Sequence, residues 1–116
     1  MITTADKLIA QAQCEIECLD IESAKSLYEK SPDAVILDVR EAGTAAESKL
    51  KDSVNISRGL IEMKVPKLCP DPDTVILTHC GGGGRASLAA ATLRKMGYNR
   101  VYAITAKYDD IKRAFG

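Results

Sequence analysis

Residues 74–87 read TVILTHCGGGGRAS, and this stretch decides the fold. Residues 74–79 form a run of apolar and β-branched residues, which predicts a strand covered on both faces. The apolar spacing of residues 85–96 predicts a helix, and Gly97 is its expected C-terminal cap. Its apolar face consists of Ala86, Ala89, Ala90, Leu93 and Met96. A strand that enters a helix through a glycine loop is typical of α/β folds, which bind ligands at the carboxyl ends of their strands.

The loop between that strand and that helix carries a candidate nucleophile, Cys80. Four glycines follow it, namely Gly81, Gly82, Gly83 and Gly84. Glycine lacks a Cβ, so the backbone can turn several N–H groups toward one point, and the helix start adds a partial positive charge. Such surroundings favour a reactive thiolate. Arg85 can bind an anion through two hydrogen bonds. The stretch therefore predicts a nucleophilic cysteine in an anion-binding loop.

Helical and strand patterns alternate along the rest of the chain. Helices are predicted over residues 4–13, 21–30, 41–48, 59–68 and 107–115, and strands over 16–19, 34–39, 53–56 and 101–104. Thr4 and Asp20 are the expected N-caps of the first two helices. Leu60, Met63 and Lys64 mark the expected packing face of the helix over 59–68. This alternation predicts an α/β fold of three layers, α/β/α, with a mainly parallel central sheet.

Length and charge narrow the classes of function. The 116 residues fit one domain, covering 1–116. Lysine plus arginine and aspartate plus glutamate both number 16, so no net charge attracts nucleic acid or an anionic membrane. No signal-peptide pattern opens the chain, and no apolar run approaches the roughly 20 residues that span a bilayer. We expect a cytoplasmic protein that is a monomer or weak homodimer.

The four cysteines are expected to be free thiols, since no secretion signal accompanies them. They are Cys14, Cys18, Cys69 and Cys80. Cys14 and Cys18 are spaced as one pair of zinc ligands could be, but the sequence has no second pair to complete the site, and the only histidine is His79. We therefore predict neither a metal nor a cofactor. His79 is expected to point away from Cys80, because adjacent side chains of a strand face opposite ways.

Several segments together resemble the rhodanese (thiosulfate sulfurtransferase) family. They are VILDVRE over residues 35–41, VNI over 54–56, RGL over 58–60, the loop from Cys80 to Arg85, MGY over 96–98 and VY over 101–102. The resemblance implies a single rhodanese-like domain with a parallel sheet of about five strands. Two segments depart from the family's pattern: residues 48–53, and residues 106–111, where a Gly-Gly pair and a tryptophan are usual.

The resemblance also implies a mechanism. Cys80 takes sulfur from a small anionic donor such as thiosulfate, holds it as a persulfide, and passes it to cyanide, a cellular thiol or a protein thiol. The loop glycines and Arg85 would bind the donor, with Arg58 as a second anion contact or simply a surface charge. The implied supporting residues are Asp38, Arg40, Ala86 and Ser87. Asp38 and Arg40 fit an ordinary strand-end ion pair equally well, and Ser87 fits the first helical turn or a substrate contact.

Two other classes of function stay open. The pair His79-Cys80 followed by an arginine resembles the cysteine phosphatases and arsenate reductases. Their loop between cysteine and arginine is longer than the four residues present here, and a shorter loop suits a sulfur atom. The second alternative is a non-catalytic interaction or persulfide-carrier module.

Overall fold

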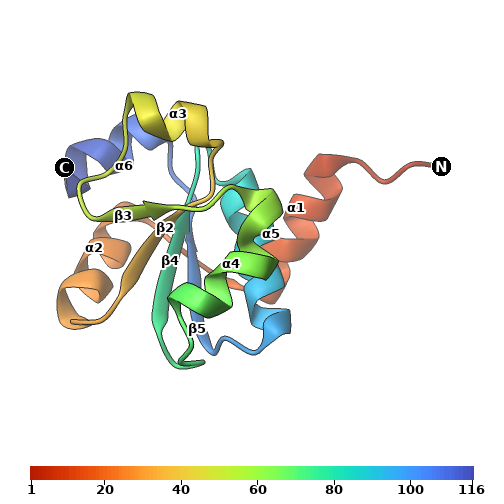
Figure 1. Cartoon of the computed structure of the whole chain (residues 1–116). Helices are drawn as coiled ribbons and strands as arrows, with labels where there is room; N and C mark the ends of the chain where they lie inside the picture. The colour runs from red at the N-terminus through yellow and green to blue at the C-terminus, as the bar shows by residue number, and fades with distance from the viewer.

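The computed structural model describes residues 1–116 and contains a five-stranded parallel sheet between two layers of helices (Figure 1). The strands lie in the order β1-β5-β4-β2-β3, and every neighbouring pair is parallel. Their bounds are β1 Glu17–Leu19, β2 Val35–Asp38, β3 Ser53–Asn55, β4 Val75–His79 and β5 Arg100–Ile104. The predicted α/β fold class is confirmed, and β4, which leads to Cys80, is the central strand.

Helices cover both faces of this sheet. They are α1 Ala5–Glu15, α2 Ile21–Lys30, α3 Ala42–Glu47, the 3-10 helix η1 Arg58–Leu60, α4 Ile61–Leu68, α5 Gly84–Met96 and α6 Tyr108–Phe115. Helices α1, α4 and α5 lie on one side, and α2 and α6 on the other (Figure 1). The oxygens of Thr4 and Asp20 accept the expected capping hydrogen bonds from Lys7 and Ser23. None of the helices is both long and apolar enough to cross a membrane.

Side chains alternate along β4 between two separate apolar cores. Ile76 and Cys80 belong to the core beneath α4 and α5, and Leu77 belongs to the core beneath α2 and α6. This period of two is the geometry of an extended strand. It sends the Cys80 side chain toward α5 and the His79 side chain toward α6, as predicted from their adjacency.

The packing face predicted for residues 59–68 is wrong. Met63 is 74% exposed and Leu60 is 41% exposed, whereas Ile61 and Val65 are fully buried. Ile61 and Val65 have the same i, i+4 spacing, and burying them avoids the desolvation of a lysine ammonium that the predicted face would have required. The face predicted for residues 85–96 is buried except for Met96 at the helix end, which is 40% exposed. The other elements differ from prediction mainly at their ends, and α1 continues to Glu15.

Candidate active site

The Cys80 sulfur sits at the carboxyl end of β4, where it accepts two backbone hydrogen bonds. The N–H of Gly83 lies 3.1 Å from Sγ and the N–H of Ala86 lies 3.4 Å from it. Cys80 is only 1% exposed, and its two donors belong to the N-cap and the first turn of α5, where the helix carries a partial positive charge. This arrangement stabilises negative charge on the sulfur, as a nucleophilic thiolate requires.

The four glycines of the loop have different roles. Gly83 has φ +97°, and a Cβ on it would lie 3.0 Å from the Thr105 Cα. A Cβ on Gly84 would lie 2.9 Å from Cδ1 of Ile9, whereas a Cβ on Gly82 would meet no atom within 4 Å. Gly83 is therefore required by its backbone geometry, whereas a side chain at Gly84 would need the end of the Ile9 side chain to shift. Gly81 and Gly82 form the exposed outer part of the loop.

The two arginines assigned to anion binding lie in different settings. Arg85 is exposed, its side chain makes no hydrogen bond or ion pair, and its Nη2 lies 3.6 Å from the Cβ position of Gly81. Its guanidinium is therefore next to the loop and free to bind an anion. The guanidinium of Arg58 instead donates to Glu62 on α4 and to Thr92 on α5, at 3.4 and 3.1 Å. The structure does not bring Arg58 to the cysteine loop.

Hydrogen bonds hold both ends of the loop, and those at its inner end are buried. The Gly83 carbonyl accepts from the Ser87 N–H at 2.9 Å and from the Ser87 hydroxyl at 2.6 Å. At the outer end, the Gly81 carbonyl accepts from the Tyr108 N–H at 3.1 Å. The Ala86 carbonyl accepts from the Thr78 hydroxyl at 2.9 Å. Ser87 therefore serves the first helical turn, and Ala86 contributes through its backbone.

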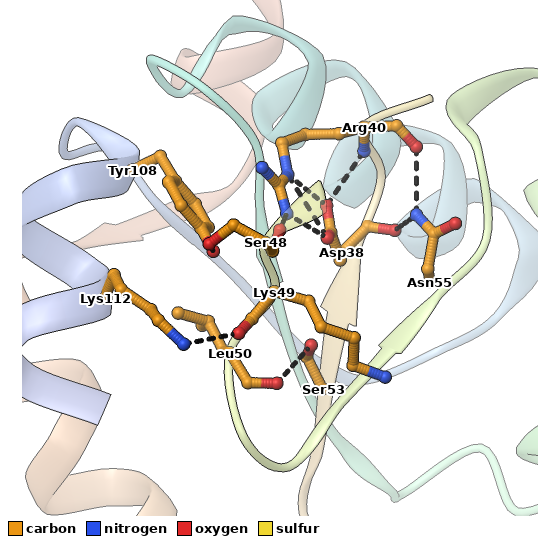
Figure 2. Close-up of polar contacts among 9 residues, drawn as sticks. All are labelled: Asp38, Arg40, Ser48, Lys49, Leu50, Ser53, Asn55, Tyr108 and Lys112. Atoms are coloured by element: carbon orange, nitrogen blue, oxygen red, sulfur yellow. Dashed lines mark hydrogen bonds and ion pairs between the residues drawn. The ribbon is translucent and has the colours of Figure 1, made fainter. Parts of the chain in front are cut away.

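Asp38 and Arg40 form a buried ion pair beside the loop (Figure 2). Arg40 Nη2 lies 2.8 Å from Asp38 Oδ2, and Nε and the backbone N–H of Arg40 each donate to Oδ1 at 3.0 Å. Burial by itself would raise the pKa of Asp38. The hydrogen bonds and positive charge of Arg40 outweigh that effect and hold this pKa below its usual range. Arg40 also donates to the Ser48 carbonyl at 2.7 Å.

Tyr108 connects this ion pair to the cysteine loop. Its ring lies under the Arg40 guanidinium, 3.9 Å from ring centroid to Cζ, while its N–H binds Gly81. Its hydroxyl is 2.7 Å from the Ser48 hydroxyl, and Lys112 Nζ donates to the Lys49 carbonyl at 2.7 Å (Figure 2). The two segments that depart from the rhodanese pattern, 48–53 and 106–111, thus lie against each other. Sequence reasoning missed Tyr108, although it stands within one of these segments.

His79 is fully buried on the opposite side of β4 from Cys80. Its ring is stacked near that of Tyr108, with 6.0 Å between centroids, and neither ring nitrogen has a hydrogen-bond partner. Burial lowers the pKa of His79, and the neighbouring Asp38 carboxylate opposes that shift without reversing it. A neutral, buried imidazole facing away from the sulfur is not placed to act as its base.

The remaining cysteines lie outside this site, and all four are free thiols. Cys14 and Cys18 are exposed, whereas Cys69 is buried, and burial raises the pKa of the Cys69 thiol. No group of three or more histidine, cysteine, aspartate or glutamate side chains could hold a metal ion.

Sequence comparisons match this chain to one domain family and to relatives described as sulfurtransferases. The model of the rhodanese-like domain matches residues 20–114. A sulfurtransferase of Allochromatium vinosum is 29% identical over 83 residues, which are 72% of this chain and 76% of the relative. A thiosulfate sulfurtransferase of Pseudomonas savastanoi is 30% identical over 95 residues, which are 82% of this chain and 86% of the relative.

Solved structures share the fold. A Rhodopseudomonas palustris protein, described as of unknown function and a possible tyrosine phosphatase, has a TM-score of 0.83 at 27% identity. That match covers 100% of this chain and 94% of the other. The human single-domain sulfurtransferase has a TM-score of 0.70 at 21% identity, covering 80% of this chain and 92% of the other.

Proposed function

Because this chain belongs to the rhodanese-like domain family, we propose that it is a sulfurtransferase that carries sulfur as a persulfide on Cys80. The proposed donor is a small sulfur anion such as thiosulfate. The proposed acceptor is cyanide, a cellular thiol or a thiol on another protein. The observation that best supports this proposal is that the Cys80 sulfur accepts hydrogen bonds from two backbone N–H groups, next to an Arg85 side chain that has no partner.

The reaction proceeds in two displacements at sulfur. In the first, the Cys80 thiolate attacks the outer sulfur of thiosulfate, the S–S bond breaks, and sulfite leaves with the bonding electron pair. In the second, the acceptor attacks the terminal sulfur of the persulfide, and the Cys80 thiolate leaves. Cyanide would yield thiocyanate, and a thiolate would yield a new persulfide. Each displacement leaves the enzyme ready for the next, so ping-pong kinetics are expected.

Each contacting group has a role in these two displacements. The N–H groups of Gly83 and Ala86 stabilise Cys80 both as the attacking thiolate and as the leaving thiolate. Arg85 is placed to bind the oxygens of the donor through charge-assisted hydrogen bonds. Gly81 and Gly82 carry no side chain over the mouth of the loop, which leaves room for an acceptor thiol held on a larger molecule.

Turnover from thiosulfate to cyanide tests this function in the natural chain, Cys80→Ser and the matched variant Cys14→Ser. Cys14 is exposed and lies outside the loop, so its variant should retain full turnover. Thiocyanate should form with the natural chain and with Cys14→Ser, and Cys80→Ser should form none.

The same enzymes should be incubated in parallel with an aryl phosphate. Release of phosphate without thiocyanate would contradict the proposal and favour the cysteine phosphatase alternative, the activity suggested for the R. palustris protein. Inactivity in both assays, together with tight binding to another protein, would favour the non-catalytic module.

A further inference from the structure

Helix α1 packs along α5 beside the cysteine loop, yet it precedes the residues matched by the rhodanese-like model, which begin at residue 20. Two of its side chains, Ile9 and Gln13, stand one helical turn apart and face the start of α5. Cδ1 of Ile9 occupies the space that a Cβ on Gly84 would need. Nε2 of Gln13 donates to the Ser87 hydroxyl at 3.1 Å. The amino-terminal helix therefore contacts the end of the loop at Gly84 and the first turn of α5 at Ser87.

The Gln13 contact continues as a chain of hydrogen bonds toward Cys80. A serine hydroxyl has one hydrogen to donate, and Ser87 gives it to the Gly83 carbonyl at 2.6 Å. The amide of Gln13 donates to one of the two lone pairs of the hydroxyl oxygen, which further restrains the rotation of the hydroxyl. Linked hydrogen bonds of this kind polarise and strengthen one another.

The series of hydrogen bonds from Gln13 ends at Gly83. Its φ of +97° turns its N–H toward Cys80, where it makes the shorter of the two hydrogen bonds to the sulfur. A glycine is free to adopt many other backbone angles, so its orientation depends on what holds its carbonyl. Ser87 holds that carbonyl through both its N–H and its hydroxyl, and Gln13 donates to the hydroxyl.

We propose that Gln13 is a positioning residue for the nucleophile, acting through Ser87 and Gly83, and that α1 is part of the active site of this chain. Loss of the Gln13 donor leaves the Ser87 hydroxyl held only by its own hydrogen bond to the Gly83 carbonyl, which weakens that bond and holds Gly83 less firmly. The N–H of Gly83 then points less steadily at the sulfur, and the thiolate is less stabilised. The functional consequence rests on the proposed sulfur transfer, whereas the effect on the thiol does not.

The test compares Gln13→Met with Gln11→Met. Methionine keeps the length of the side chain and the helix propensity while removing the amide. Gln11 is exposed on the same helix and makes no hydrogen bond through its side chain, so it is a matched control. The rate of Cys80 alkylation by iodoacetamide is measured from pH 5.5 to 9, with peptide mass mapping to separate Cys80 from the exposed Cys14 and Cys18. Thermal melting confirms that both variants fold.

Gln13→Met should slow alkylation at neutral pH about threefold to tenfold, the effect of one lost hydrogen bond, and should shift the profile to higher pH. It should lower kcat for sulfur transfer with little change in KM. Identical alkylation profiles for the two variants would overturn the inference even if sulfur transfer proceeds. A shifted profile in a chain that transfers no sulfur would support it while the proposed function fails.

Discussion

The two sides of the end of β4 differ in which hydrogen-bonding groups remain free. On the Cys80 side, two N–H groups point at the sulfur, and Arg85 is exposed without a partner. On the His79 side, the Arg40 guanidinium is bound to Asp38 and Ser48 and stacked on Tyr108. The comparison separates two roles for arginine: a free one can bind substrate, and a fully bonded one holds the scaffold.

Removal of Arg40 should have the largest effect on stability. Arg40→Met leaves the Asp38 carboxylate buried without its partner, which should lower the free energy of unfolding by about 3–5 kcal/mol. Urea denaturation followed by circular dichroism measures the change.

Arg113→Met is the control for that experiment, because the Arg113–Asp110 pair is exposed and should contribute little. The double variant Asp38→Asn with Arg40→Met should recover part of the loss, since no buried charge remains. A loss below about 1 kcal/mol in the free energy of unfolding of Arg40→Met would show that the Asp38–Arg40 pair contributes little to stability.

Removal of Arg85 should instead affect catalysis and leave stability intact. Arg85→Ala should reduce kcat/KM for thiosulfate about tenfold to a hundredfold, the usual effect of losing a hydrogen bond to a charged group. Arg58→Ala is the paired variant, and it should stay within about twofold of the natural enzyme because Arg58 binds Glu62 and Thr92. Equal losses in the two variants would contradict the difference between the arginines.

Substitution of the glycines tests which part of the loop is constrained. Gly83→Ala should destabilise the chain by about 1–2 kcal/mol and reduce turnover, because alanine is strained at positive φ and meets Thr105. Gly82→Ala should change stability by less than about 0.5 kcal/mol, since its Cβ enters open space. Denaturant unfolding and turnover, measured on both variants, check the contrast, and similar results for the two would rule it out.

His79 should make stability depend on pH by a smaller amount. Its pKa in the folded chain lies below the ordinary value, so the unfolded chain takes up the proton first as the pH falls. Stability should therefore be complete above about pH 6.5 and decrease below it, by at most about 1.4 kcal/mol per pH unit.

The free energy of unfolding at pH 7.5, 6.5 and 5.5 measures this effect, with His79→Leu as the variant that should remove the slope. His79 is the only histidine of the chain. The contribution of Asp38, whose pKa is lowered, disappears only at more acidic pH, below about 4. An unchanged slope in His79→Leu would assign the pH dependence to other groups.

The order of elements and the position of Cys80 could be predicted because both follow from local patterns. A buried strand, a glycine run and an alanine-rich helix are contiguous in sequence, and alternation along the strand separated His79 from Cys80. The same reasoning failed for Leu60 and Met63, where a competing pair at the same spacing is buried instead.

Contacts between distant segments could not be predicted from those patterns. Tyr108 reaches Gly81 and Arg40, and Gln13 reaches Ser87 across 74 positions of sequence. Nothing local to Tyr108 or Gln13 marks either residue. The Arg58 guanidinium was placed at the anion site by resemblance alone, and its side chain binds α4 and α5 instead.

The central claim is that Cys80 carries sulfur, and peptide mass mapping after incubation with thiosulfate tests it most directly. We expect a gain of about 32 Da, the mass of one sulfur atom, on the peptide that contains Cys80, and its loss when cyanide is added. Absence of that gain on Cys80, or its appearance on Cys14 or Cys18 instead, would contradict the account.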